Sequence, residues 1–372
     1  WIEDIARKFR YSSRSLSKGA KQGIISSCVK ITGLSRTQVK RLLKSYRKHG
    51  CIVRKTTTRH KFPRVYTTDD VALLVKADNA VLRRSGPAMA HTFRRMYERY
   101  GKDDYSRLAN ISVSHLYNLR ETRQYQSHTL TVSGTKSVAV PIGRREKPKT
   151  EGKPGFIRVD TVHQGDLGKV KGVYYINLVD EATQWEVVAC VPNISELFLE
   201  PVLEACLSLF PFCILGFHSD NGSEYINKVI ARLLKKLLID QTKSRARRTN
   251  DNALVEGKNG AVVRKHFGYG HIPKRHAAAI NHYLKKWLVP YLNFHRPCAF
   301  ATEYIDTKGK IKKKYETHLT PFEKLASLSD AYQCLKKGIT LESLKQIERE
   351  HDDISFAELK EKERSKLFKS LS

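Results

Sequence analysis

Apolar residues in the middle of the chain form short runs separated by turn residues. Five runs have the length and composition of strands, at residues 156–162, 173–179, 185–191, 212–217 and 239–242. Apolar residues recur at helical spacing at 195–210, 226–238 and about 252–267. Pro201 falls inside the first of these helices and predicts either a bend or a later start. The pattern therefore predicts an α/β core in which three strands precede the first helix.

The N-terminal segment shows a helical pattern interrupted by a short turn. Residues 23–31 predict one helix and residues 32–34 a turn, and Ser35 is suited to be the N-cap of a second helix ending near Gly50. The second helix has an apolar face of Val39, Leu42 and Leu43. Its outward residues, expected to enter a DNA major groove, are Arg36, Thr37, Gln38, Lys40, Arg41 and Lys44. A helix-turn-helix domain is one reading, and a solvated basic helix in an unrelated bundle is the other.

A similar pattern recurs further along the chain. Residues 91–100 and 103–110 predict helices, and residues 113–123 predict a second recognition helix after a cap at Ser112. The residues that this helix would offer to DNA are Ser114, His115, Tyr117, Asn118 and Arg120. The same alternative applies here, but two modules in tandem would span two successive grooves of a duplex.

The segments on either side of the core carry less information. Residues 126–154 are basic and poor in large apolar side chains, so Arg144 and Arg145 either follow a phosphate backbone or belong to a solvated tether. Thr320 and Glu323 form a capping-box pattern. Residues 340–371 predict a charged helical pair that mediates subunit contacts or binds DNA.

The charge balance indicates a polyanionic partner. Lys and Arg number 68 against 37 Asp and Glu, a formal net charge of +31 spread over several segments. We identify no apolar run of transmembrane length and no signal peptide in the sequence, so nucleic acid is favoured over an anionic membrane. Seven cysteines without a CxxC pair predict a reduced, intracellular protein. The expected location is the cytoplasm, with nucleoid association in a prokaryote. The sequence has no GxxxxGK[ST] phosphate loop, which argues against a built-in ATPase, and it begins at Trp1, as a fragment or processed form would.

Three carboxylates occupy positions suited to metal-assisted phosphoryl transfer. Asp160 lies in the first predicted strand, Asp220 follows the fourth, and Glu256 lies near the start of the helix at 252–267, with 256 − 220 − 1 = 35 residues between the last two. Each of them alone is more often a turn residue or a helix-terminal charge. Together they match the chemistry of two hard divalent cations, which prefer oxygen ligands and act jointly on a phosphodiester.

The run His218-Ser219-Asp220-Asn221-Gly222-Ser223-Glu224-Tyr225, with Asp160 and Glu256, resembles the DDE catalytic core of retroviral integrases and insertion-sequence transposases. The resemblance covers roughly residues 155–297. It implies an RNase H-like fold with a mixed five-stranded sheet, in which Asp160 contacts two Mg²⁺ (or Mn²⁺) ions, Asp220 one of them and Glu256 the other. Asn259 and Arg264 share a helix face with Glu256 and are expected to hold DNA phosphates beside the metals.

The resemblance also implies an activity and an organisation. The expected protein is a DNA transposase that binds the terminal repeats of a mobile element, nicks the element end and joins the 3′ hydroxyl to target DNA, as a dimer or tetramer on paired ends. The expected divisions are 1–58 and 59–125 for two all-α helix-turn-helix domains, 126–154 for the linker, 155–298 for the core and 299–372 for a mainly helical C-terminal region.

Two details depart from the resembled families. Residues His295-Arg296-Pro297 resemble a segment that closes the core of many transposases, but Cys298 follows where His is common. We find no N-terminal His/Cys zinc motif like that of retroviral integrases. A nuclease of the same fold and a non-catalytic DNA-binding regulator remain alternatives; a regulator would usually have lost a carboxylate, and all three are present.

Overall fold

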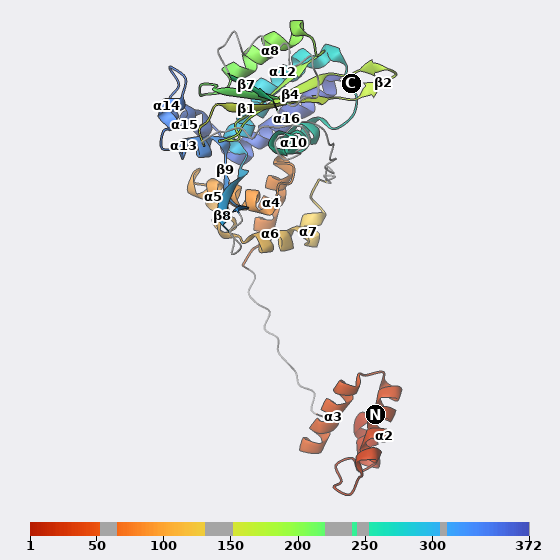
Figure 1. Cartoon of the computed structure of the whole chain (residues 1–372). Helices are drawn as coiled ribbons and strands as arrows, with labels where there is room; N and C mark the ends of the chain where they lie inside the picture. The colour runs from red at the N-terminus through yellow and green to blue at the C-terminus, as the bar shows by residue number, and fades with distance from the viewer. Residues whose placement is uncertain (53–64, 131–151, 220–239, 244–252, 306–310, 372) are drawn as a thin grey trace. The chain divides into compact units, whose positions relative to one another are not determined.

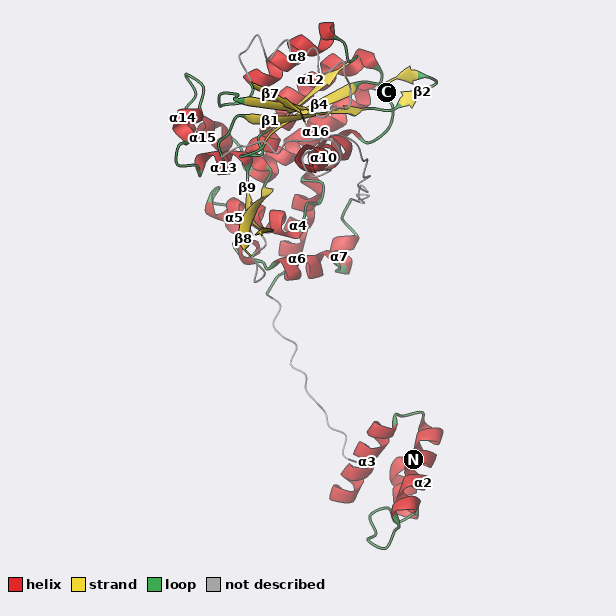
Figure 2. Ribbon diagram, in the orientation of Figure 1, coloured by secondary structure: helices red, strands yellow, loops and turns green. Residues whose placement is uncertain are grey.

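The computed structural model describes residues 1–52, 65–130, 152–219, 240–243, 253–305 and 311–371. The chain divides into two compact units, Trp1–Arg64 and Val65–Ser372. Figure 1 shows both units coloured along the chain, and Figure 2 shows the distribution of their helices and strands.

The first unit contains three helices, α1 (Ile2–Lys8), α2 (Lys18–Thr32) and α3 (Arg36–His49). Gly33 ends α2 in the left-handed conformation at φ 67°, which glycine adopts without strain, and the Ser35 hydroxyl accepts a hydrogen bond from the Gln38 amide at the start of α3. Val39 and Leu43 are fully buried against α2, as the apolar spacing predicted. The turn and second helix therefore form as expected, and α2 begins five residues earlier, at Lys18 rather than residue 23.

The second unit contains a five-stranded mixed sheet, which confirms the predicted strand number. Its order is β5-β4-β1-β6-β7. The strands are β1 (Phe156–His163), β4 (Tyr174–Asp180), β5 (Glu186–Val191), β6 (Gly216–Ser219) and β7 (Asp240–Lys243). β1 pairs antiparallel with β4 and parallel with β6, so β1 is the central strand.

The fourth strand begins later than predicted. Phe212, expected at its start, is instead fully buried and forms an isolated bridge with Leu335. The amide of Cys213 donates to the carbonyl of Cys334, and pairing with β1 begins only at Gly216. An apolar run alone does not distinguish a strand in the main sheet from a segment held by a distant loop.

The remaining elements of the second unit are mostly helical. The helices before and within the sheet are α4 (Thr68–Ala80), α5 (Gly86–Glu98), η1 (Asp103–Tyr105), η2 (Leu108–Asn110), α6 (Val113–Arg120), α7 (Arg123–Gln126) and α8 (Glu196–Ser208). Those after it are α10 (Ala253–Lys258), η4 (Asn259–Arg264), α11 (Lys265–Phe267), η5 (Lys274–His276), α12 (Ala277–Tyr283), η6 (Leu284–Leu288), η7 (Tyr291–His295), α13 (Pro321–Ala326), α14 (Ala331–Cys334), α15 (Leu341–Arg349) and α16 (Asp353–Leu371). Two hairpins complete the unit, β2 (Asp166–Leu167) with β3 (Val170–Lys171) and β8 (Cys298–Ile305) with β9 (Ile311–Leu319).

The two faces of the sheet bury different side chains of the same strands. In β5, Val188 and Cys190 belong to a core with the helices at 259–267 and 277–295, whereas Val187 and Ala189 belong to a core with α8. This alternation follows from the two-residue period of a strand. The mixed-sheet α/β core, with helices on both faces (Figure 1), is compatible with an integrase-like fold.

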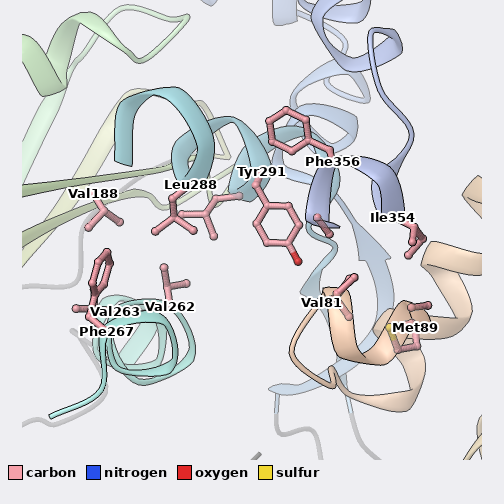
Figure 3. Packing of buried hydrophobic residues seen from close by; sticks show 14 of the residues in the cluster. Val81, Met89, Val188, Val262, Val263, Phe267, Leu288, Tyr291, Ile354 and Phe356 are labelled. Atoms are coloured by element: carbon pink, nitrogen blue, oxygen red, sulfur yellow. The ribbon is translucent and has the colours of Figure 1, made fainter. Parts of the chain in front are cut away.

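The segment expected to be a separate second domain has no core of its own. Val81 at the end of α4 and Met89 of α5 share a buried cluster with Tyr291 of η7 and Ile354 of α16, as Figure 3 shows. This shared cluster includes residues on both sides of the expected boundaries at 125 and 299. Periodicity indicates that a helix buries one face, but it does not identify the partner of that face.

No helix within the described ranges combines the length and the apolar character needed to cross a membrane.

Candidate active site

Asp160 lies in the middle of the central strand. Its strand partner on β4 is Asn177, so the two side chains lie on the same face of the sheet. The adjacent Val159 packs into the core on the other face. Asp160 therefore faces the helix that begins with α10, which packs against β1 and β4.

That helix touches Asp160 through an asparagine. The Asn259 amide nitrogen donates to Asp160 Oδ2 at 2.6 Å, and the Asn259 oxygen accepts from Asn177 Nδ2 at 2.9 Å. The Thr161 backbone amide donates to the other oxygen, Oδ1, at 2.8 Å. These bonds fix the orientation of the carboxylate and tie three elements together at one point.

The helix changes its winding at this same residue. Residues 253–258 are α-helical, and residues 259–264 form a π-helical stretch. π-helical turns in longer helices are uncommon and often occur at functional sites. Here the wider turn begins at the residue that contacts Asp160.

A buried ion pair anchors the helix one residue earlier. The Lys258 ammonium lies 3.3 Å from Glu186 of β5 and donates to Cys298 Sγ at 3.1 Å. Lys258 is 6% exposed and Glu186 is fully buried, so the pair is shielded from solvent. Sequence reasoning assigned no role to Cys298 or Lys258. The structure shows that Cys298 accepts a hydrogen bond from Lys258 and so helps to hold the helix.

The other two carboxylates are only partly within the described structure. Asp220 lies outside the described residues, but it follows Ser219, which pairs with Val159 in the parallel β1–β6 register. The backbone of Glu256 lies in α10, one turn before Asn259. Within the described residues no group of three His, Cys, Asp or Glu side chains could hold a metal ion, and neither Asp220 nor the Glu256 side chain belongs to that set.

Arg264 is half-buried and makes several contacts within the protein. Its guanidinium donates to the carbonyl of His163 at 2.8 Å and to Gln164 Oε1 at 3.2 Å, and it lies 4.8 Å from the centre of the Tyr269 ring. Burial lowers the pKa of Arg264. Arg264 therefore fastens the end of β1 to the helix, and its expected contact with a DNA phosphate stays a prediction.

The candidate DNA-contacting residues of the first unit are all exposed. They are Arg36, Thr37, Gln38, Lys40, Arg41 and Lys44. Arg36 also donates to Gln22 on α2 at 2.6 Å. The helix thus presents these residues to solvent, as its apolar periodicity predicted.

The second set, on α6, is divided. Ser114, Tyr117 and Asn118 are exposed, His115 is half-buried against the Tyr66 ring, and Arg120 is only 2% exposed. The Arg120 guanidinium makes two bonds to Asp78, at 2.6 and 2.8 Å, and a third to the carbonyl of Arg84. The expectation that Arg120 contacts DNA is wrong, because the side chain closes a buried ion pair. Arg144 and Arg145 lie outside the described residues.

The sequence did not predict a second buried cluster of charged side chains, which surrounds Arg95. Arg95 of α5 contacts Asp353 at 2.8 Å, Glu348 at 3.1 Å and Glu323 at 2.6 Å. His295, to which the sequence assigned no chemistry, hydrogen-bonds Asp353 at 3.0 Å and is 2% exposed. Arg95 precedes Asp353 by 258 residues and His295 precedes it by 58. No local sequence pattern therefore indicates these contacts.

No protein-family model matches the chain. A curated relative, the uncharacterised protein y4rM of Sinorhizobium fredii (strain NBRC 101917 / NGR234), is 28% identical over 331 residues, which cover 86% of this chain and 92% of the relative.

Retroviral integrases are among the similar solved structures. The HTLV-2 integrase catalytic core domain in complex with magnesium (trimeric form) is similar over 29% of this chain and 66% of its own, with 21% identity and a TM-score of 0.22. The simian T-cell lymphotropic virus intasome in complex with PP2A regulatory subunit B56 gamma is similar over 51% of this chain and 67% of its own, with 13% identity and a TM-score of 0.29.

Proposed function

We propose that this protein is a DNA transposase of the DDE type, a polynucleotidyl transferase that nicks the end of a mobile element and joins the 3′ hydroxyl to target DNA. The observation that carries the proposal is the bond of 2.6 Å between Asn259 and Asp160. It joins the helix that contains Glu256 to the carboxylate of the central strand. In the sequence Asp220 directly follows Ser219, the last residue of the strand beside β1.

Asp160, Asp220 and Glu256 are the residues that would hold two Mg²⁺ ions, with Mn²⁺ as a substitute. Carboxylate oxygens are the ligands that these hard cations prefer. A carboxylate offers about four acceptor directions, so the bonds from Thr161 and Asn259 to Asp160 are compatible with metal binding. When bound, the two ions would activate the attacking oxygen and stabilise the leaving oxygen of a phosphodiester.

The roles of the chain's own residues follow from the geometry. Asn259 would hold Asp160 in one orientation, and Lys258 with Glu186 would hold the helix at a fixed distance from the sheet. Rigid support of this kind matters because small displacements of metal ligands reduce activity strongly. The exposed basic face of α3 would bind the terminal repeat, with Arg41 among the contacting residues. Paired element ends imply a dimer or tetramer on DNA.

The test is a metal-dependent cleavage and joining assay with the full chain and a labelled DNA that carries the element's own end. Asp160→Asn is expected to abolish cleavage and joining in Mg²⁺ while leaving end binding near that of the wild type. Asp166→Asn is the matched control, because Asp166 lies exposed in the β2–β3 hairpin and undergoes the same chemical change.

Three results would count against the proposal. Full cleavage by Asp160→Asn would remove that residue from the site. Cleavage without joined product would favour a nuclease of the same fold. Tight end binding with no cleavage in Mg²⁺ or Mn²⁺ would favour a regulator.

A further inference from the structure

A cavity of about 200 Å³ is lined in part by residues that follow Asn259 in the helix that contacts Asp160. It is bounded by the turn after α4, by Ala261 to His266, and by Tyr291 to Pro297. Four cationic side chains line it, Arg83, Arg84, Lys265 and Arg296, and its described lining includes no Asp or Glu. A single water needs only about 10–15 Å³, so there is room for a larger polar group. We call this space the basic cavity.

The charges in the basic cavity are poorly compensated by the protein. Arg84 is 9% exposed, and its guanidinium donates to the Tyr291 hydroxyl at 2.5 Å and to the His295 carbonyl at 3.4 Å, which are neutral acceptors. Among the described residues, the Lys265 ammonium donates a long hydrogen bond of 3.4 Å to the Arg83 carbonyl. Burial of cations without a counter-charge is unfavourable.

The carboxylates around the basic cavity are already paired with other cations. Asp78 binds Arg120 at 2.6 Å. Asp353 binds Arg95 at 2.8 Å. Glu186 is 3.8 Å from Arg296 and closer, at 3.3 Å, to Lys258. The protein's own acids therefore leave the cavity with an excess of positive charge.

The protonation of Lys265 reflects this environment. Burial, followed by the charges of Arg84 and Arg296, lowers the pKa of Lys265 to about 8. An anion in the cavity would oppose both effects and favour the charged ammonium.

The backbone at the edge of the basic cavity has an uncommon conformation. Leu82 and Arg83 adopt consecutive left-handed conformations, with φ 58° and 47°, which non-glycine residues rarely do. This turn leads into α5, and the N-cap residue Ser85 and Ala88 in the first turn of α5 line the cavity. The Ser85 side chain does not cap the 13-residue helix. Figure 3 shows the Tyr291 hydroxyl directed toward the segment that carries Val81.

We infer that the basic cavity binds a phosphate group, carried on a nucleic-acid strand or present as a free phosphate ion. Arg84 and Arg296 supply guanidinium groups, whose planar donors match phosphate oxygens, and Lys265 supplies a compact charge. This inference does not depend on the proposed catalytic activity, because none of the cavity's cations belongs to the carboxylate site.

The first experiment measures thermal unfolding of the full chain in inorganic phosphate and in chloride at equal ionic strength. Phosphate is expected to raise the Tm of the wild type above its value in chloride. Lys265→Gln should raise the half-saturating phosphate concentration by at least about tenfold, because it removes a charged hydrogen bond. Lys265→Arg, which keeps the charge, should retain most of the effect.

Two controls separate the site from general charge effects. Lys285→Gln makes the same charge change at an exposed position of η6 and should respond to phosphate as the wild type does. In chloride, Lys265→Gln should be at least as stable as the wild type, because it removes a poorly paired, half-buried cation. Asp160→Asn should keep the full phosphate response, so a failure of the proposed catalysis does not affect this result.

A second measurement identifies the source of the phosphate. Labelled single-stranded and duplex oligonucleotides are titrated in phosphate-free buffer. Weaker binding by Lys265→Gln than by Lys285→Gln, with competition by inorganic phosphate, supports a strand phosphate. Unchanged oligonucleotide binding together with a lost phosphate response supports a free ion. The inference is overturned if phosphate does not stabilise the wild type, or if Lys265→Gln responds as Lys285→Gln does.

Discussion

Replacing Arg120 with alanine is expected to destabilise the second unit, although its sequence context predicted a DNA contact. The Arg120 side chain makes a two-bond pair with Asp78 at 2.6 and 2.8 Å and is 2% exposed. Asp78 is 1% exposed, and after the substitution its remaining side-chain donor would be the Tyr125 hydroxyl at 2.9 Å. Removal of one partner leaves an uncompensated buried carboxylate.

The expected loss is about 3–5 kcal/mol, the range found for breaking buried pairs from one side. With a urea m-value of about 3 kcal/mol/M for a unit of this size, the unfolding midpoint would fall by about 1–1.7 M. Tryptophan fluorescence can follow this unit separately, because Trp185 and Trp287 both belong to it and Trp1 belongs to the first unit. A Trp1→Phe background removes the signal of the first unit.

Arg41→Ala is the matched control, since Arg41 is exposed on α3. Its free energy of unfolding should stay within about 0.5 kcal/mol of the wild type, while end-specific DNA binding weakens by about 1–3 kcal/mol if Arg41 contacts a base. The structural reasoning is refuted if Arg120→Ala keeps the wild-type midpoint and loses as much specific DNA binding as Arg41→Ala. A double variant, Asp78→Leu with Arg120→Met, should lose less than the sum of the single losses, because no unpaired charge remains.

Two further predictions concern acid stability and the candidate site. Burial alone would raise the pKa of Glu323, but the bond from His91 and the charge of Arg95 outweigh it and lower the pKa from 4.5 to about 2. The lowered pKa contributes about 3 kcal/mol to the free energy of unfolding. This contribution is present above pH 4.5 and is lost as the pH falls toward 2. Urea unfolding across this range should show a smaller decrease in the free energy of unfolding for Glu323→Gln than for the wild type, and an equal decrease would contradict the prediction. Asn259→Leu should lower the cleavage rate about 10–100-fold and raise the half-saturating Mg²⁺ concentration with end binding unchanged; an unaltered Mg²⁺ dependence would remove Asn259 from its positioning role.

Local patterns predicted many of the elements, because each depends on neighbours in sequence. The helix predicted at 103–110 is wrong, because this segment contains two short 3-10 helices, η1 and η2. The cap at Ser35, the glycine that ends α2 and the buried face of α3 all follow from residues within one or two turns. The central position of Asp160 also followed from the order of the strands. The contact between Asp160 and Asn259 did not, because it joins residues 99 apart and depends on a π-helical turn with no sequence signature.

The sequence did not predict which charged side chains are exposed and which are buried in ion pairs. Arg41 and Arg120 lie in similar basic helical segments, yet one is exposed and the other is buried beside Asp78, 42 residues away. Arg95 is likewise neutralised by acids that lie more than 200 residues further along. The formal net charge of +31 therefore does not tell which cations are paired inside the protein and which lack a counter-charge.

The helix at 253–267 bears on both proposals. Asn259 on one side contacts Asp160, and Lys265 on another side lines the basic cavity. The backbone between them is π-helical, and Lys258 anchors it to the sheet through Glu186. A phosphate drawn toward Lys265 would therefore act on the same rigid element that supports the carboxylate. If the phosphate belongs to a DNA strand, Lys265→Gln should impair strand joining more than it impairs binding, because a strand that loses this contact can still bind but is no longer fixed relative to Asp160.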